Sequence, residues 1–154
     1  MLVSPPDPRV AHSSGEVQGQ VKVSIQYLRG QLEIMVQHAR NLALLNGAEP
    51  SPYAKLYLLP DPYKKTKRKT KVVKKSCHPS FMEAITYRMS QDIVAQRMLE
   101  ISVWSEEKFS ENVYLGSCYV RLSSISLDEE TSEWLSLENQ WNTATGHTIQ
   151  HETA

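Results

Sequence analysis

The chain has 154 residues, with 17 basic and 17 acidic side chains and therefore a formal net charge of zero. This length fits one compact domain with a substantial core, but not two. No apolar run of about 18 residues is present, and prolines and serines stand where a signal peptide needs its apolar core, which predicts neither a membrane span nor a secretory signal. The two cysteines, Cys77 and Cys118, are typical of a reduced, cytoplasmic protein rather than of a disulfide framework.

Composition divides the chain into a central domain and two tails. Residues 1–18 are rich in Pro, Ser and Gly, and residues 139–154 are polar and without a periodic pattern. Both segments lack the apolar residues needed to form a packed core. The sequence therefore predicts one domain at residues 19–138 between two flexible tails.

Alternation of apolar and polar residues dominates the domain. It is clear at residues 21–27 and resumes at residues 32–36 after the turn at residues 28–30, which predicts a hairpin of half-buried strands. Further strand-like runs follow at residues 53–59, 67–73, 81–87, 98–104, 113–122 and 133–137. One short helix is expected at residues 90–96, with Ser90 as its cap. The pattern predicts an all-β protein, an eight-stranded antiparallel β-sandwich with one short helix before strand six.

Residues 64–75, here called the basic window, carry eight basic side chains and no acidic one. The remainder of the chain then holds 9 basic against 17 acidic side chains, so zero net charge is an average of +8 and −8. Such a segment favours docking to a polyanion, although charge runs are also found as plain solvated surface.

As a strand, this segment would place its side chains on two different faces. Lys67, Lys69, Lys71 and Val73 would share the outward face, and Thr66, Arg68, Thr70 and Val72 would share the face able to pack. Same-face neighbours are about 7 Å apart, so Lys69 and Lys71 could bind two phosphates of one headgroup.

Several single residues have a structural and a functional interpretation. Trp104 lies off the apolar face of strand 98–104, which favours a surface role. His38 continues the apolar face of its strand and is interpreted as a structural histidine. His78 follows Cys77 but lacks the spaced partners of a zinc site. Cys118 is expected in the core. No Gly-rich phosphate loop, nucleophile motif or pair of catalytic carboxylates indicates an enzyme.

Five motifs in order resemble those of a C2 domain of synaptotagmin-like topology. They are LALLNG at residues 42–47, SPYAKLYLLPD at 51–61, KRKTK at 67–71, HPSFME at 78–83 and YLG at 114–116. The finer resemblance is to the C-terminal C2 domain of class II phosphoinositide 3-kinases, through strings such as GQVKVSIQY, TKRKTK and AQRMLEISV. The resemblance implies a binding domain without catalysis, whose parent lipid kinase would hold its catalytic residues outside this chain.

Many C2 domains bind calcium through five loop aspartates, and this sequence departs from that pattern. The corresponding positions are Leu45, Ser51, Ser105, Glu107 and Val113. Calcium requires about six to eight oxygen ligands, several of them carboxylate. One carboxylate in five positions predicts no calcium site, and no other metal or cofactor is expected.

The C2 domains of protein kinase C hold a phosphoinositide headgroup on a lysine-rich concave face, and the resemblance implies a corresponding site here. Its residues are Tyr53, Lys55, Lys69, Lys71, Trp104 and Asn112. An additional basic patch would comprise Lys64, Lys65, Lys67, Arg68, Lys74 and Lys75. Ammonium groups and aromatic rings of this kind suit a phosphorylated inositol.

These observations predict calcium-independent binding of anionic phospholipid, in particular phosphatidylinositol bisphosphate, by a monomeric, cytoplasmic domain that associates peripherally with membranes. One alternative is a protein-interaction C2 domain whose basic strand binds an acidic partner, such as a vesicle-trafficking protein. A nucleic-acid binder is a second alternative, but the basic window contains no aromatic residue on which a base could stack.

Overall fold

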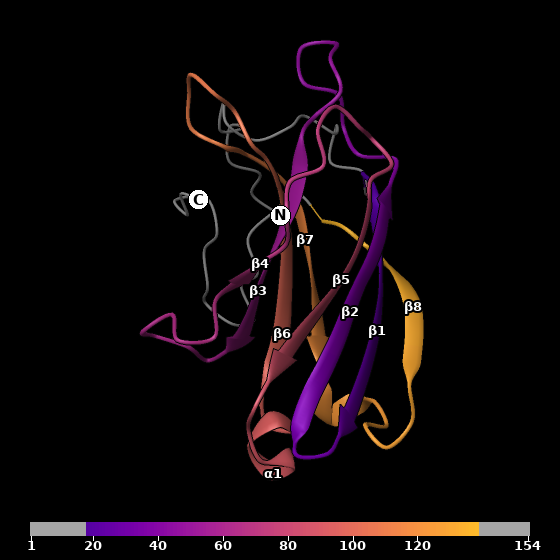
Figure 1. The fold of residues 1–154 in the computed structure, drawn as a ribbon, viewed down its shortest axis with the longest axis vertical. Coiled ribbons are helices and arrows are strands. Elements are labelled where there is room, and N and C mark those ends of the chain that lie inside the picture. Colours follow the sequence, from indigo (N-terminus) through magenta and orange to yellow (C-terminus); the bar gives the residue numbers. More distant parts are fainter. Residues whose placement is uncertain (1–17, 139–154) are drawn as a thin grey trace, which may run out of the picture.

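The computed structural model describes residues 18–138, which form two antiparallel four-stranded sheets packed face to face (Figure 1). The strands are β1 Gln20–Leu28, β2 Gln31–Arg40, β3 Pro52–Leu59, β4 Arg68–Lys69, β5 Ser80–Tyr87, β6 Met98–Ser105, β7 Val113–Arg121 and β8 Thr131–Ser136. The helix α1 Gln91–Val94 precedes β6, and a 3₁₀ turn, η1 Leu122–Ser124, follows β7. The predicted eight-stranded antiparallel sandwich with one short helix before strand six is confirmed. The predicted tails lie outside the described residues, except for Gln18.

Strand order is β5-β2-β1-β8 in one sheet and β4-β3-β6-β7 in the other. The predicted hairpin joins β1 and β2, with Leu28 opposite Gln31. Its two turn residues, Arg29 and Gly30, both have positive φ angles, of 55° and 81°. Such a two-residue turn matches the right-handed twist of the flanking strands.

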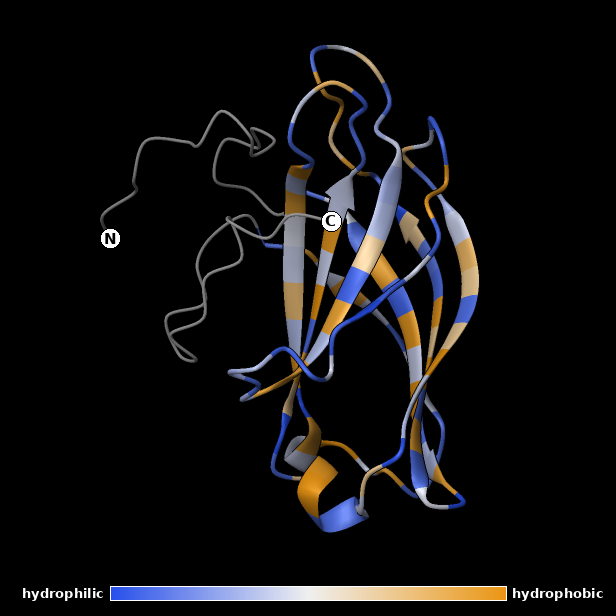
Figure 2. Ribbon diagram, turned by 60° about the vertical axis from the view of Figure 1, so that its left-hand side comes forward, coloured by the Kyte–Doolittle hydropathy of each residue, from blue (hydrophilic) through white to orange (hydrophobic). Residues whose placement is uncertain are grey.

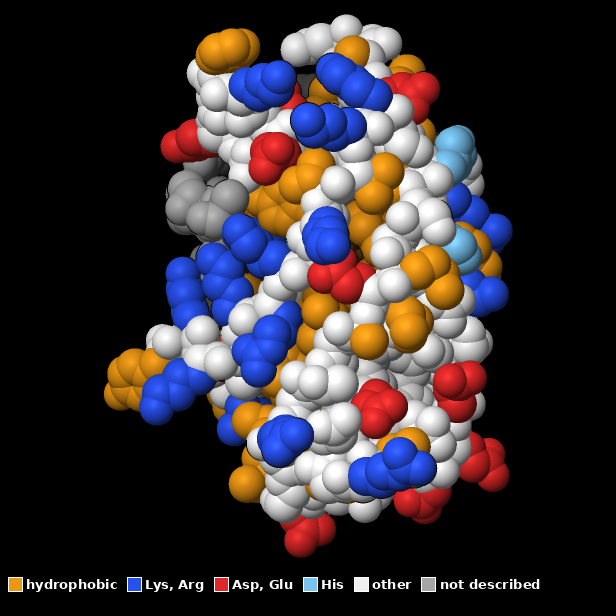
Figure 3. All heavy atoms as spheres, viewed as in Figure 1, with side chains coloured by type: hydrophobic (Ala, Val, Ile, Leu, Met, Phe, Trp, Pro, Cys, Tyr) orange, Lys and Arg blue, Asp and Glu red, His pale blue; other side chains and the backbone are white. Residues whose placement is uncertain are grey.

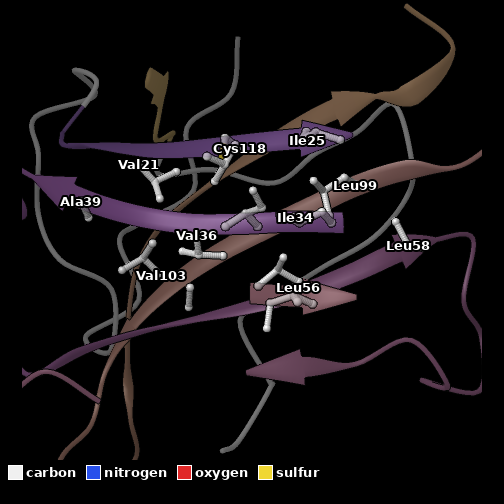
Figure 4. Close-up of a cluster of buried hydrophobic side chains, with 14 of the residues drawn as sticks. Val21, Ile25, Ile34, Val36, Ala39, Leu56, Leu58, Leu99, Val103 and Cys118 are labelled. Carbon is white, nitrogen blue, oxygen red and sulfur yellow. The ribbon is translucent and has the colours of Figure 1, made fainter. Parts of the chain in front are cut away.

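The core lies between the two sheets. It is formed by every second residue of each strand, whose side chain points toward the opposite sheet. Apolar and polar segments alternate along the strands in Figure 2. Figure 4 shows Ile34 of β2, Leu56 of β3 and Leu99 of β6 among the inward side chains. Cys118 of β7 is buried with them, as predicted. Burial of apolar surface contributes about 25 cal/mol per Å², so this alternation is the main stabilising feature of the fold.

The predicted strand at residues 67–73 is wrong in its length, because β4 contains only Arg68 and Lys69. Beyond Lys69 the chain still runs beside β3, with Thr70 N donating to Ala54 O and Val73 N to Pro52 O, both at 2.9 Å. The regular ladder ends because Ala54 N donates to the hydroxyl of Thr70 instead of to a backbone carbonyl. Pro52 has no N–H with which to extend it.

The predicted helix at residues 90–96 is shorter than expected, but its cap is correct. Ser90 has extended backbone angles and its hydroxyl accepts from Ile93 N at 3.4 Å. Val94 is buried and anchors this turn to the sandwich. Among the described residues no helix is long and apolar enough to cross a bilayer.

Candidate functional site

The predicted headgroup residues lie on the outer face of the sheet β4-β3-β6-β7. Ala54 and Leu56 point into the core, so the alternate residues of β3, Tyr53 and Lys55, face away from it. In the register of the sheet, Lys55 is opposite Lys69 of β4, and Tyr53 is opposite Trp104 of β6. Four of the six predicted residues are therefore direct cross-strand neighbours.

Side-chain contacts link the same residues and add Asn112. The Lys55 Nζ lies 4.5 Å from the centroid of the Trp104 ring. The Lys69 Nζ lies 5.8 Å from the Tyr53 ring centroid. Asn112 Nδ2 donates to the Tyr53 hydroxyl at 2.9 Å, which ties the loop before β7 to β3. The structure thus brings together five of the six predicted residues.

Lys71 is positioned by a different element. Its backbone N–H donates to Glu83 Oε2 at 2.8 Å, so β5 of the opposite sheet fixes this part of the basic window. The Lys71 side chain is exposed, as is that of Lys69. The Glu83 carboxylate also places one negative charge beside the predicted site and lowers its positive potential.

Burial contradicts the predicted surface role of Trp104. Trp104 is 1% exposed and Lys55 is 0% exposed, although both lie on the face directed away from the core. Trp104 packs edge-on against Tyr114, with ring centroids 5.4 Å apart, and its Nε1 donates to Ser102 Oγ. With Tyr53 these two rings form a second apolar cluster, which the period-two pattern of the sequence did not reveal. Only the β6–β7 register, in which Tyr114 is opposite Trp104, identifies Tyr114 as a member of this cluster.

The protonation state of Tyr53 follows from the same packing. Burial raises the pKa of Tyr53, and the hydrogen bond from Asn112 offsets part of that effect. The phenol therefore stays protonated at neutral pH. Tyr53 is 2% exposed, so its hydroxyl could donate to a phosphate oxygen, while still accepting from Asn112, only after a local rearrangement.

The threonines of the basic window lie on its inner side, as predicted. Thr66 and Thr70 are buried, and their hydroxyls accept from Leu58 N and Ala54 N, each at 2.9 Å. Asp61 shapes the loop before β4, because its carboxylate accepts from the backbone N–H groups of Lys65 and Thr66. The pKa of Asp61 is raised by desolvation, but hydrogen bonds from Thr66 and Lys65 outweigh this and lower it overall.

The additional basic patch surrounds the short strand β4 rather than extending it. Lys64, Lys65, Lys74 and Lys75 are exposed, whereas Lys67 and Arg68 are half-buried. The Arg68 guanidinium carbon lies 4.7 Å from the Tyr87 ring centroid. Figure 3 shows basic side chains gathered along this side of the molecule.

The five degenerate calcium positions do not rebuild a carboxylate cage in the structure. Ser105 Oγ accepts from Ser51 N at 2.9 Å and donates to Glu107 Oε2 at 3.1 Å. Leu45 and Val113 pack partly against the core. Between residues 18 and 138 there is no group of three or more His, Cys, Asp or Glu side chains that could hold a metal ion.

The predicted inward position of His38 is wrong. A register shift between Val36 and His38 in the β2–β5 pairing moves the apolar face on to Ala39, which is buried, and leaves His38 half-exposed. His38 Nδ1 lies 3.0 Å from Ser80 Oγ. A β-bulge of this kind inverts side-chain orientation, and no residue type in the strand signals it.

Comparison with known proteins gives one consistent result. The family model named "C2 domain" matches residues 30–137. The human phosphatidylinositol 4-phosphate 3-kinase C2 domain-containing subunit beta is 47% identical over 129 residues, which are 82% of this chain and 8% of that protein. Mouse synaptotagmin-like protein 1 is 37% identical over 125 residues, which are 80% of this chain and 22% of that protein.

A solved structure agrees with these sequences. A C2 domain of RIM from Drosophila has 30% sequence identity and a TM-score of 0.74, over 80% of this chain and 100% of that one. C2 domains are binding modules rather than catalytic ones, and the chain spans only 8% and 22% of the two curated relatives above. The family model, the identities and the shared fold together place this chain in the C2 domain family.

Proposed function

We propose that this C2 domain binds anionic phospholipid without calcium, with a preference for phosphatidylinositol bisphosphate, and so recruits a larger protein to cytoplasmic membrane surfaces. The main support is the convergence of Tyr53, Lys55, Lys69, Trp104 and Asn112 on one face of one sheet. Lysines and aromatic rings grouped in this way suit a ligand that has both phosphates and an inositol ring.

The accessible part of the site is its pair of exposed lysines. Lys69 and Lys71 are exposed, whereas Lys55 is buried beside Trp104. A phosphate would therefore contact Lys69 and Lys71 first, and contact with Lys55 requires a local rearrangement. Each lysine near an anionic leaflet contributes about 1 kcal/mol to binding, so the two exposed lysines would contribute about 2 kcal/mol.

The proposal of calcium independence is supported by the chemistry of the loops. Ser51 and Ser105 stand at two of the expected aspartate positions, and the Glu107 carboxylate is already hydrogen-bonded to Ser105 Oγ. Calcium prefers several carboxylates around one ion, and a single carboxylate would hold it only weakly.

The parent protein is proposed to be a lipid kinase. The relative at 47% identity is named as a phosphatidylinositol 4-phosphate 3-kinase subunit, and this chain corresponds to only 8% of it. The phosphorylation chemistry would then lie in other domains, and this domain would position them at the membrane.

Vesicle binding tests the proposal. The full chain is mixed with vesicles of neutral lipid, of neutral lipid with phosphatidylserine, and of the same mixture with phosphatidylinositol bisphosphate, each with calcium or with a chelator. We expect binding that requires the bisphosphate and does not change with calcium. The variant Lys69→Ala/Lys71→Ala should lose about 2 kcal/mol, which is about 30-fold in affinity.

The matched control removes two charges elsewhere. Arg29, in the turn between β1 and β2, and Arg121, at the end of β7, are exposed and belong to neither the basic window nor the predicted site, so Arg29→Ala/Arg121→Ala should bind almost as the unmodified chain does. If both variants lost vesicle affinity equally, the loss would be an effect of net charge and not of Lys69 and Lys71. Binding to none of the vesicles would refute the proposal and favour an acidic protein as the partner, and binding only with calcium would refute the interpretation of the loops.

A further inference from the structure

The outer face of the other sheet, β5-β2-β1-β8, carries a group of basic side chains around one indole ring. The Arg40 guanidinium carbon lies 3.8 Å from the centroid of the Trp134 ring, and the Lys22 Nζ lies 5.9 Å from it. The His38 ring is stacked on Trp134 with centroids 6.5 Å apart and an interplanar angle of 27°. We call these four residues the Trp134 cluster.

Strand register explains why the four side chains meet. Lys22 of β1 is opposite both His38 of β2 and Trp134 of β8, so one row crosses three strands. Arg40 lies two residues beyond His38 on the same strand and reaches the ring from there. Lys22 faces outward by ordinary alternation between the buried Val21 and Val23, and the register shift between Val36 and His38 on β2 turns His38 outward to meet it.

The polar contacts of the Trp134 cluster do not neutralise its charge. Arg40 Nε donates to the amide oxygen Gln20 Oε1 at 2.8 Å, and His38 Nδ1 contacts the Ser80 hydroxyl. No ion pair joins Lys22, His38 or Arg40 to a carboxylate among residues 18–138. All four side chains of the cluster are half-exposed and can be reached by a ligand.

Stabilisation of the sheet alone is a weaker explanation of this arrangement. One contact between a cation and an indole contributes about 0.5–1 kcal/mol at an exposed position. If the cluster only stabilised the sheet, one such contact would be enough. Two permanent positive charges and a histidine around one ring instead repel one another unless an anion lies among them.

We propose that the Trp134 cluster binds an extended acidic segment of a partner protein. On an extended peptide, carboxylates two residues apart are about 7 Å from one another. Successive carboxylates could therefore contact different cations around the ring. The indole offers a surface for the aliphatic part of a glutamate side chain, and the Arg40 guanidinium can form paired hydrogen bonds with a carboxylate.

A protein segment is favoured over a membrane by the geometry of the sandwich. The outer faces of the two sheets point in opposite directions (Figure 1), so a bilayer lying against Lys69 and Lys71 cannot also contact Trp134. Only this choice of occupant rests on the proposed lipid function. The Trp134 cluster and its charge do not depend on it.

Nuclear magnetic resonance titration separates the two basic surfaces. The full chain, labelled with ¹⁵N, is titrated with an eight-residue peptide of alternating glutamate and threonine, and with the same peptide carrying glutamine in place of glutamate. We expect saturable amide shifts at residues 20–24, 36–40 and 132–136 with the glutamate peptide only. Soluble inositol bisphosphate should instead shift residues around Lys55, Lys69 and Lys71.

The decisive variant is Lys22→Gln/Arg40→Gln, which should weaken the peptide affinity measured at these amides at least tenfold. The control Arg88→Gln/Arg121→Gln removes the same charge and should leave that affinity unchanged. If thermal unfolding shows that the double variant is not folded, Lys22→Gln alone should still weaken peptide binding, whereas Lys22→Arg should preserve it.

Four results would overturn the proposal, and the first three concern the peptide. They are peptide shifts confined to the basic window, equal affinity in the double variant and the unmodified chain, or equal binding of the glutamine peptide. Saturation of the Trp134 cluster by inositol bisphosphate without any response to the peptide would also overturn it. Loss of vesicle binding with peptide binding intact would refute only the lipid function.

Discussion

Thr70 offers a direct test of how the basic window is held against β3. Its side chain is 7% exposed, and its hydroxyl accepts from Ala54 N at 2.9 Å while lying 3.1 Å from the carbonyl oxygen of Lys71. Valine has nearly the same shape, so Thr70→Val leaves no large cavity but deprives the buried Ala54 N–H of this acceptor. An unsatisfied buried donor costs about 1–3 kcal/mol, and we expect the free energy of unfolding to fall by about 2 kcal/mol.

Urea unfolding followed by circular dichroism measures this change, and two variants serve as controls. Thr70→Ser keeps the hydroxyl and should lose much less stability than Thr70→Val. Thr86→Val makes the same chemical change at an exposed position of β5 and should stay within about 0.5 kcal/mol of the unmodified chain. If Thr70→Val is no more destabilising than Thr86→Val, the hydroxyl does not hold this segment and our account of β4 is wrong.

Three further predictions concern other parts of the sandwich. Gly116 has a φ of 149°, and a Cβ there would lie 2.9 Å from Leu137 Cβ, so Gly116→Ala should lower the free energy of unfolding by about 1–3 kcal/mol; an unchanged urea midpoint would contradict this. Burial raises the pKa of Cys118 to about 12, so a thiol reagent at pH 8 should modify only Cys77 in the folded protein and both cysteines in urea, and rapid modification of both without urea would contradict this. Folding lowers the pKa of Asp61 below its ordinary value of 3.8. The contribution of the Asp61 carboxylate to stability is therefore present above pH 3.8, and it is lost as the pH falls through the folded pKa. Asp61→Asn should therefore flatten the acid side of the stability profile, measured by unfolding between pH 7 and 2, and parallel profiles would show that another group is responsible.

Local sequence determines most of this fold. The alternation at residues 21–27 and 32–36 specifies which side chains of β1 and β2 enter the core, and Arg29-Gly30 supplies the positive φ angles that their turn needs. The extent of β4 was not predictable in this way. It depends on the threonine hydroxyls taking the place of backbone acceptors along β3, which is a property of the pair and not of either segment.

The proximity of five of the six candidate residues was predictable, but their exposure was not. The family resemblance placed Tyr53, Lys55, Lys69, Trp104 and Asn112 together, and the contacts agree. The burial of Trp104 depends on Tyr114 and Tyr53, which pack against it from neighbouring strands. The Trp134 cluster was missed because the bulge before His38 changes the face of the strand, and a bulge leaves no mark in residue periodicity.

Carboxylates near the basic window shape its backbone as well as balancing its charge. Asp61 accepts from the backbone N–H groups of Lys65 and Thr66, and Glu83 accepts from that of Lys71. These bonds hold the segment in a fixed shape on either side of β4, while the ammonium groups of Lys69 and Lys71 remain on the exposed side. Because the remainder of the chain carries the opposite charge, the chain has a separation of charge despite its zero net charge. Such a separation orients the approach to an anionic surface, and its reach is limited to about 10 Å at 0.1 M salt. Association with anionic vesicles should therefore slow steeply as salt is added, even though the isolated chain is neutral overall.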